Sequence, residues 1–185
     1  MGVAMARKAT LIGAGMLAII ASSAMAIAAY IGAPARGNAW QSIAWPFPRD
    51  GWPPGHAYRC PAASCGNEME LYVRPKIGFC NCDTGVADDD EVDRVADLDL
   101  ISPRFRPVQQ GEVVHLAGMT GRVRRYSLDM NDGSTRQAIG LAVSHRCDLM
   151  VAAAQGKASA ADLQQKTLDL LSSSSEADWI KSAMQ

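Results

Sequence analysis

The sequence has no acidic residue at its start: none of its 19 Asp and Glu residues comes before Asp50. Aromatic residues are also few, at 6% of the chain, and the formal net charge at pH 7 is only −1. A nucleic-acid-binding chain normally carries a marked excess of Lys and Arg, because the phosphate backbone supplies most of the affinity. We therefore expect no nucleic-acid partner.

The motifs of several common enzyme classes are missing as well. The sequence contains no G-x-S-x-G, no H-E-x-x-H and no P-loop. Its most acidic segment, Asp88–Asp99, lacks the D-x-D-x-D-G loop of an EF-hand and is expected to be a helix with a solvated acidic face. These absences favour a protein that is not an enzyme and that needs no cofactor.

One long uncharged run, Ala9–Ala35, is the most informative feature that the sequence does contain. As a helix it would be roughly 40 Å long, enough to cross a hydrocarbon core of about 30 Å with some tilt. Arg7 and Lys8 precede it, so residues 1–8 are expected on the cytoplasmic side and everything after Arg36 outside. Residues 9–31 are thus predicted to be a single-pass signal-anchor helix.

A cleaved signal peptide is the alternative for the same residues. Residues 1–8 form a short basic region, an apolar segment follows, and Ala24-Met25-Ala26 fits an A-x-A cleavage site. Both alternatives export the C-terminal part, into the periplasm if the cell is bacterial.

Small residues also recur within the run at a spacing of four. Such a stripe lets a second helix approach closely, although an Ala-rich span produces this spacing by chance. The stripe consists of Ala14, Ala18, Ser22 and Ala26.

Residues 32–56 are rich in Trp, Pro and Gly and are expected to form an irregular tether. Proline removes a backbone donor and disfavours helix in the preceding residue. The three tryptophans Trp40, Trp45 and Trp52 would suit either the membrane–water interface or packing on the following domain.

The remaining residues, 57–185, predict a cysteine-containing α+β domain outside the membrane. Met69, Leu71 and Val73 alternate with polar residues, which indicates a half-buried strand. A turn at Pro75-Lys76 with a return strand over 77–82 is expected to follow. Further strands are predicted over 112–119, 122–129, 136–146 and 148–154, with a tight turn at 131–133.

Helices are predicted at three places in this domain. Asp88 with Glu91 three residues later starts the acidic helix, and Ser159 opens a helix that contains four leucines. A last short helix carries Trp179 and Ile180. The fold class is therefore α+β, an antiparallel sheet with helices on one side, preceded by the membrane helix.

Four cysteines lie close together in the sequence, and in an oxidising compartment they are expected to form disulfides. The predicted hairpin would bring the later two back to the earlier two. The alternative is a zinc site with four cysteine ligands and His56 as an extra ligand, or a thiol-redox site, although the spacing fits zinc in its first half only. The four are Cys60, Cys65, Cys80 and Cys82.

The fifth cysteine, Cys147, stands apart and is expected to be a small buried apolar residue. Its neighbour His145 raises the alternative of a thiolate–imidazole pair, and an odd cysteine could also bridge to a protein partner or to a second copy. Arg122, Arg124 and Tyr126 would share one face of a strand, where they could meet an anion or an acidic partner.

Taken together, the sequence favours a membrane-anchored envelope protein. Its disulfide-stapled domain would act as a binding or structural module. A metal-binding or thiol-redox protein that uses the cysteine cluster is the alternative.

Overall fold

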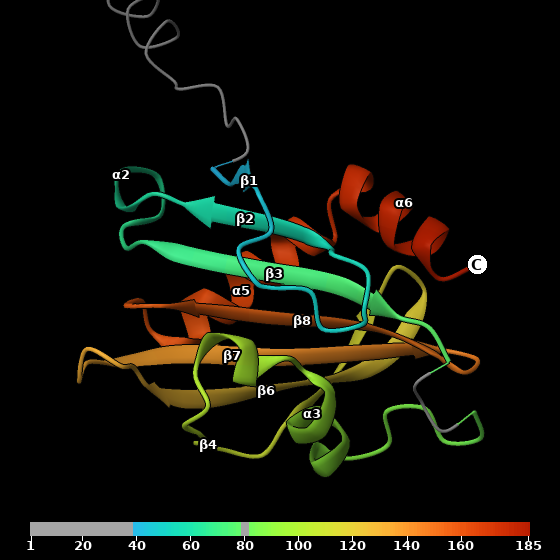
Figure 1. Ribbon diagram of the computed structural model, residues 1–185. Helices are drawn as coiled ribbons and strands as arrows, with labels where there is room; N and C mark the ends of the chain where they lie inside the picture. The colour runs from blue at the N-terminus through green and yellow to red at the C-terminus, as the bar shows by residue number, and fades with distance from the viewer. Residues whose placement is uncertain (1–38, 79–81) are drawn as a thin grey trace, which may run out of the picture. The chain divides into compact units, whose positions relative to one another are not determined.

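An eight-stranded antiparallel sheet forms the centre of the protein in the computed structural model, which describes residues 39–78 and 82–185 (Figure 1). The strand order is β1-β2-β3-β8-β7-β6-β4, and β5 pairs with β6 beside β4. The strands are β1 (Gln41–Ile43), β2 (His56–Cys60), β3 (Met69–Lys76), β4 (Phe105–Pro107), β5 (Glu112–Leu116), β6 (Met119–Asp129), β7 (Thr135–His145) and β8 (Asp148–Gly156).

Five helices occur in the described residues. The predicted starts of two of them are confirmed by their caps, since Asp88 accepts a hydrogen bond from Glu91 N and Ser159 accepts one from Asp162 N. The helices are α2 (Ala62–Cys65), α3 (Asp89–Val95), α4 (Leu98–Ile101), α5 (Ala160–Leu171) and α6 (Ser174–Ala183).

The strands β6, β7 and β8 form a long meander, as the sequence predicts. Asp129 pairs with Thr135 across the turn at 131–133, where Gly133 has a φ of 80°. The β7–β8 turn closes between His145 and Asp148. The antiparallel sheet and the C-terminal helices of the predicted domain are therefore confirmed.

Helices cover both faces of the sheet, not one face as expected. Leu141 of β7 packs in the cluster that contains α5 and α6, whereas the next residue, Ala142, packs against α3. Consecutive strand residues point to opposite faces, so the two helix pairs lie on opposite sides, with α5 behind and α3 in front in Figure 1. The acidic helix has Val92 and Val95 buried on its sheet side, which is why it docks there.

The predicted hairpin around Pro75-Lys76 is wrong. β3 runs straight through both residues and pairs with β2 on one side and β8 on the other. Pairing with β2 ends at Val73, so Pro75 occupies a position with no β2 neighbour, where a missing N–H is tolerated.

The domain begins earlier in the chain than residue 57. β1 lies inside the predicted tether and pairs with β2, and Trp40 is buried in the core. Further along, Phe47 and Trp45 pack edge-to-face on Tyr72, with ring centroids 4.7 and 6.1 Å from its ring. Trp40 and Trp45 thus pack on the domain, Trp40 in its core and Trp45 against the ring of Tyr72.

Residues 1–38 lie outside the described residues. The cytoplasmic segment 1–8, the predicted membrane helix 9–31 and the stripe of Ala14, Ala18, Ser22 and Ala26 all fall there. In residues 39–78 and 82–185 no helix has the length and apolar character that a membrane crossing requires.

Candidate ligand-binding pocket

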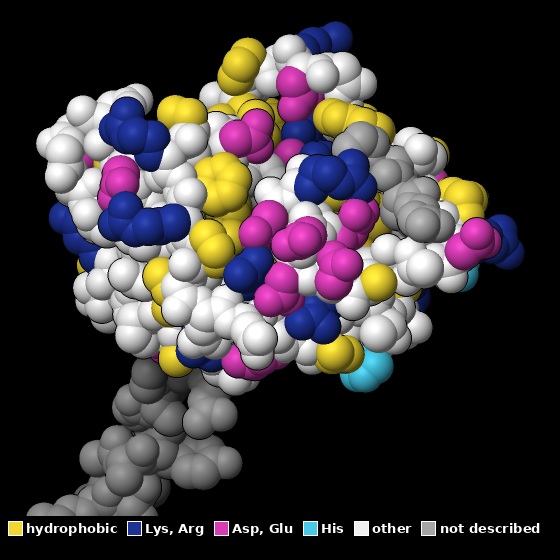
Figure 2. Space-filling view, turned by 90° about the horizontal axis from the view of Figure 1, so that it is seen from below, with side chains coloured by type: hydrophobic (Ala, Val, Ile, Leu, Met, Phe, Trp, Pro, Cys, Tyr) yellow, Lys and Arg dark blue, Asp and Glu magenta, His cyan; other side chains and the backbone are white. Residues whose placement is uncertain are grey.

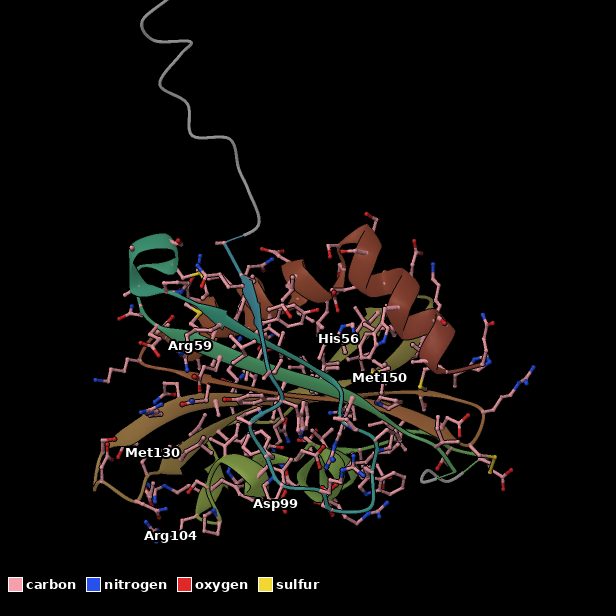
Figure 3. All side chains as sticks on the ribbon, turned by 45° about the horizontal axis from the view of Figure 1, so that its top comes forward. His56, Arg59, Asp99, Arg104, Met130 and Met150 are labelled. Carbon is pink, nitrogen blue, oxygen red and sulfur yellow. A yellow bond between two sulfur atoms is a disulfide. The ribbon has the colours of Figure 1, made fainter. Side chains whose placement is uncertain are left out.

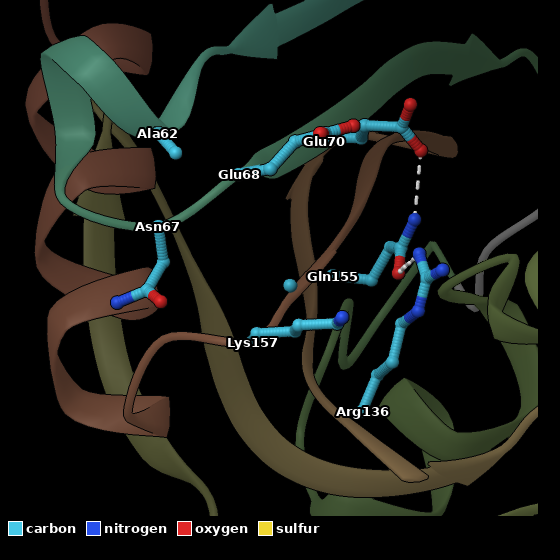
Figure 4. A pocket seen from close by; sticks show the side chains of 8 residues that line it. Ala62, Asn67, Glu68, Glu70, Arg136, Gln155 and Lys157 are labelled. Carbon is cyan, nitrogen blue, oxygen red and sulfur yellow. Dashed lines mark hydrogen bonds between the residues drawn. The ribbon is translucent and has the colours of Figure 1, made fainter. Parts of the chain in front are cut away.

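A polar pocket of about 320 Å³ lies between the start of β3 and the end of β8 (Figure 4). This volume is at the lower end of the range for small-molecule sites. The pocket is lined by Ala62, Asn67, Glu68, Glu70, Arg136, Gln155, Gly156 and Lys157.

One wall of the pocket is acidic and comes from β3 and the residue before it. Glu70 accepts hydrogen bonds at 2.7 Å from Arg59 Nη2, the Tyr72 hydroxyl and Gln155 Nε2. Burial acts to raise the pKa of Glu70, but these hydrogen bonds outweigh it and lower the pKa. Glu70 is therefore an ionised carboxylate with its acceptor positions largely used. Arg59 Nε also lies 3.7 Å from Glu68 Oε1.

The opposite wall is basic and comes from β7 and from the end of β8. Arg136 Nη1 donates to Gln155 Oε1 at 2.8 Å, whereas its Nε is buried with no acceptor. Lys157 reaches into the same space in Figure 4. Gln155 is only 4% exposed, so it joins the two walls as a fixed amide.

A disulfide loop forms the rim of the pocket beside the acidic wall. Cys60 and Cys65 are bonded, with Cα atoms 6.0 Å apart, and they close a loop that includes α2. Ala62 in that loop lines the pocket. The backbone approaches closely at Gly156, where an added Cβ would lie 2.7 Å from Glu68 O, so glycine is required at this position.

The second disulfide links Cys82 to Cys147, which are 65 residues apart in the sequence. Cys147 is therefore a disulfide partner and neither a lone apolar residue nor the nucleophile of a pair with His145. The bond between Cys60 and Cys65 lies within the four-cysteine cluster, but the expected return of Cys82 to the earlier pair is wrong, because β3 does not turn back. Its end lies beside the β7–β8 turn, as the pairing of Lys76 with Leu149 shows, and it carries Cys82 away from Cys60.

The described residues do not support the alternative of a four-cysteine zinc site. Cys60, Cys65 and Cys82 are bonded to sulfur, so they cannot act as thiolate ligands in this form. Cys80 lies outside the described residues. Within residues 39–78 and 82–185, no group of three or more His, Cys, Asp or Glu side chains could hold a metal ion.

His56, proposed as an extra ligand, instead helps to hold α6. Its Nδ1 is 3.2 Å from Glu176 Oε2, and its ring stacks on Trp179 with centroids 3.7 Å apart. The Tyr58 hydroxyl donates to Glu176 Oε1 at 2.6 Å. Figure 3 shows His56 beside α6, whereas Arg59 lies toward the α2 end of the same strand.

The predicted face of Arg122, Arg124 and Tyr126 meets an acidic surface within the chain. Arg122 Nη2 lies 2.7 Å from Asp89 Oδ1, and Arg124 Nη1 lies 2.8 Å from Asp93 Oδ2. The Tyr126 hydroxyl donates to Asp93 Oδ1, and burial followed by this bond raises the pKa of Tyr126.

This face of β6 is therefore largely occupied by α3. Figure 2 shows the acidic side chains that gather on this side of the molecule, with Lys and Arg side chains among them. The acids of α3 that face the sheet form ion pairs with its arginines. The sequence had predicted that the acidic face of this helix would be solvated.

A buried ionic cluster lies further along β3. Arg74 is 2% exposed and donates to Asp97 at 2.6 Å and to Asp50 at 2.7 and 2.8 Å. Lys76 is 6% exposed and donates to the other oxygen of Asp97, also at 2.6 Å. Because every one of these charges has a close partner, the cluster pins the β1–β2 connection and the start of α4 onto the sheet.

Sequence reasoning missed the pocket residues. The sequence held one signal of a polar site: Gln155 is a single amide that directly follows the apolar run from Leu149 to Ala154. Arg136 and Lys157 lie at the ends of strands and belong to no sequence motif. Only the pairing of the strands brings them together.

No known family matches this chain, and no curated protein is significantly similar to it.

Proposed function

We propose that this protein is an exported envelope protein whose disulfide-stapled domain is a binding module, held at the membrane by its N-terminal hydrophobic segment. The observation that carries the proposal is the bond between Cys82 and Cys147. Disulfides of this structural kind persist in oxidising compartments and are rare in the cytosol. The run Ala9–Ala35 supplies a physical route to such a compartment.

Binding is favoured over catalysis by the composition of the pocket. Its lining contains no Ser, Thr, Cys or His side chain, and its half-buried acid, Glu70, already accepts four hydrogen bonds. A general base needs free acceptor capacity toward a substrate proton. The walls are instead suited to holding a polar molecule.

A topology reporter tests the location. Alkaline phosphatase joined after Gln185 becomes active only outside the cytosol, so we expect active fusions in a bacterial host. The matched control is Ile19→Lys with Ile20→Lys, which interrupts the hydrophobic run and should abolish the activity. An inactive fusion of the unaltered chain, with a cytosolic reporter active at the same place, would refute export.

Two further measurements refine the proposal. Four of the five cysteines are in the two disulfides, so at most one thiol per chain should titrate in denaturant before reduction, and five afterwards.

An alkaline carbonate wash distinguishes a retained membrane anchor from a cleaved signal peptide. An anchored chain stays with the membrane, whereas a cleaved one is released.

A further inference from the structure

We infer that the pocket binds a small hydroxylated organic acid, whose carboxylate lies between Arg136 and Lys157. This inference rests on the proposed binding function and names its ligand class. Four features of the pocket favour such a ligand: the charges of its walls, the unused donors of Arg136, the contacts that hold this arginine, and the polarity of the acidic wall.

Both acids of the pocket have a cation within ion-pair distance, whereas the two cations of the opposite wall have no acid of the described residues within that distance. Arg59 approaches both acids of the β3 wall, at 2.7 Å from Glu70 and 3.7 Å from Glu68. In the described part of the chain, Arg136 and Lys157 form no ion pair. Asp132 attracts Arg136 only from a longer distance and does not line the pocket. An anion between Arg136 and Lys157 would offset the repulsion between these two cations.

Arg136 has more donors than the protein uses. A guanidinium carries five N–H groups, and here one hydrogen bond goes to Gln155, while the buried Nε has no acceptor. Lys157 adds an ammonium with three donors on the same side of the pocket (Figure 4). Charge-assisted hydrogen bonds from Arg and Lys are the usual means of holding a carboxylate.

Arg136, the inner cation of the basic wall, is held by the protein before any ligand arrives. Gln155 is buried and spans from Arg136 to Glu70, and the Tyr72 hydroxyl also donates to Glu70. This chain of hydrogen bonds restricts the movement of the guanidinium group. A preorganised cation loses little side-chain entropy on binding.

The acidic wall, which faces Arg136 and Lys157, determines which groups the rest of the ligand must carry. Asn67 and Glu68 are exposed at the rim and offer an amide and carboxylate oxygens. Carboxylate oxygens accept hydrogen bonds from hydroxyl groups but repel a second anionic group. A ligand with one carboxylate and several hydroxyl groups therefore fits both walls.

The test uses the purified full-length chain in a nonionic detergent and isothermal titration calorimetry. The probes are gluconate and sorbitol, which share a hydroxylated six-carbon chain and differ in the terminal carboxylate, together with inorganic phosphate. We expect gluconate to bind with a Kd of about 1 mM or tighter, and sorbitol at least about tenfold more weakly. Phosphate should also bind more weakly than gluconate, because it lacks the hydroxylated chain.

The variants Lys157→Gln and Arg136→Gln should each weaken gluconate binding about tenfold or more, which corresponds to the loss of one charge-assisted bond. Lys157→Arg should retain binding. The matched control is Lys181→Gln, which removes an equal charge from α6, outside the pocket lining. Because Lys157 is exposed, its variants are expected to fold, and thermal melts check this.

Three results would overturn the inference: no binding of gluconate by the unaltered chain, sorbitol or phosphate binding as tightly as gluconate, or full binding by folded Lys157→Gln. The outcome is separate from that of the export test. An active reporter fusion without gluconate binding refutes the ligand class alone. Gluconate binding by a chain whose fusion is inactive refutes the location alone.

Discussion

Asp97 supports the buried ionic cluster, and replacing it by Asn should destabilise the protein markedly. Its two carboxylate oxygens each accept a hydrogen bond at 2.6 Å, one from Arg74 Nε and one from Lys76 Nζ. Both cationic residues are less than a tenth exposed, at 2% for Arg74 and 6% for Lys76. Without the charge, Lys76 keeps the carbonyl oxygen of Val95, at 2.9 Å, but loses its carboxylate.

Asparagine is the appropriate replacement because it isolates the charge. Asp97 has a φ of 58°, in the left-handed region, which Asn adopts more easily than other non-glycine residues. The Asn side chain has the same shape, and its oxygen can still accept one hydrogen bond. Breaking a buried ion pair from one side costs about 3–5 kcal/mol, so we expect a loss of about 3 kcal/mol.

Urea unfolding of the full-length chain in nonionic detergent, followed by circular dichroism, measures this loss. The matched control is Asp99→Asn in α4, the short helix that Asp97 precedes, where the side chain is exposed and the change should stay within about 0.5 kcal/mol. Adding Lys76→Met to Asp97→Asn should restore part of the stability, because it removes a buried cation that has lost its carboxylate. If Asp97→Asn costs less than about 1 kcal/mol, the cluster does not hold the fold together as argued.

Three further predictions concern the disulfide, the last helix and acid stability. Cys147→Ser should lower the free energy of unfolding by about 4 kcal/mol under oxidising conditions, because its bond to Cys82 spans 65 residues, and this difference should vanish in reductant. Glu176→Gln should speed amide hydrogen exchange in α6 while leaving exchange in the central strands unchanged, because the buried carboxylate accepts from Tyr58 at 2.6 Å; unchanged exchange in α6 would contradict this role. The pKa of Asp50 is lowered to about 2, chiefly by hydrogen bonds from its arginine partner. Its contribution is therefore present at neutral pH and lost as pH falls from about 4 to about 2, so Asp50→Asn and the unaltered chain should converge in stability below that range.

The strands and helices that depend on local pattern were predictable. The turn at 131–133, the alternation along β7 and the caps at Asp88 and Ser159 are short-range signals, and the structure has β6, β7, α3 and α5 where those signals place them. The turn at Pro75-Lys76 failed because a proline is also tolerated where a strand has lost its neighbour on one side. Local chemistry alone does not distinguish these two situations.

The helices on both faces were missed for a related reason. The valines of α3 indicate that the helix has an apolar side, but not which face of the sheet that side covers. Its acids were expected in solvent, whereas Asp89 and Asp93 pair with Arg122 and Arg124 of β6. The partner of a charged residue cannot be identified from the sequence until the order of the strands is known.

The amino-acid sequence by itself determined the hydrophobic N-terminal run, the α+β class and the expectation of disulfides in an oxidising compartment, because composition and short-range periodicity carry that information. Tertiary structure alone decided that Cys147 pairs with Cys82, that Arg74 and Lys76 share Asp97, and that a pocket opens beside Arg136. Each of these depends on residues that are distant in the chain and become neighbours only when the strands take their order in the sheet.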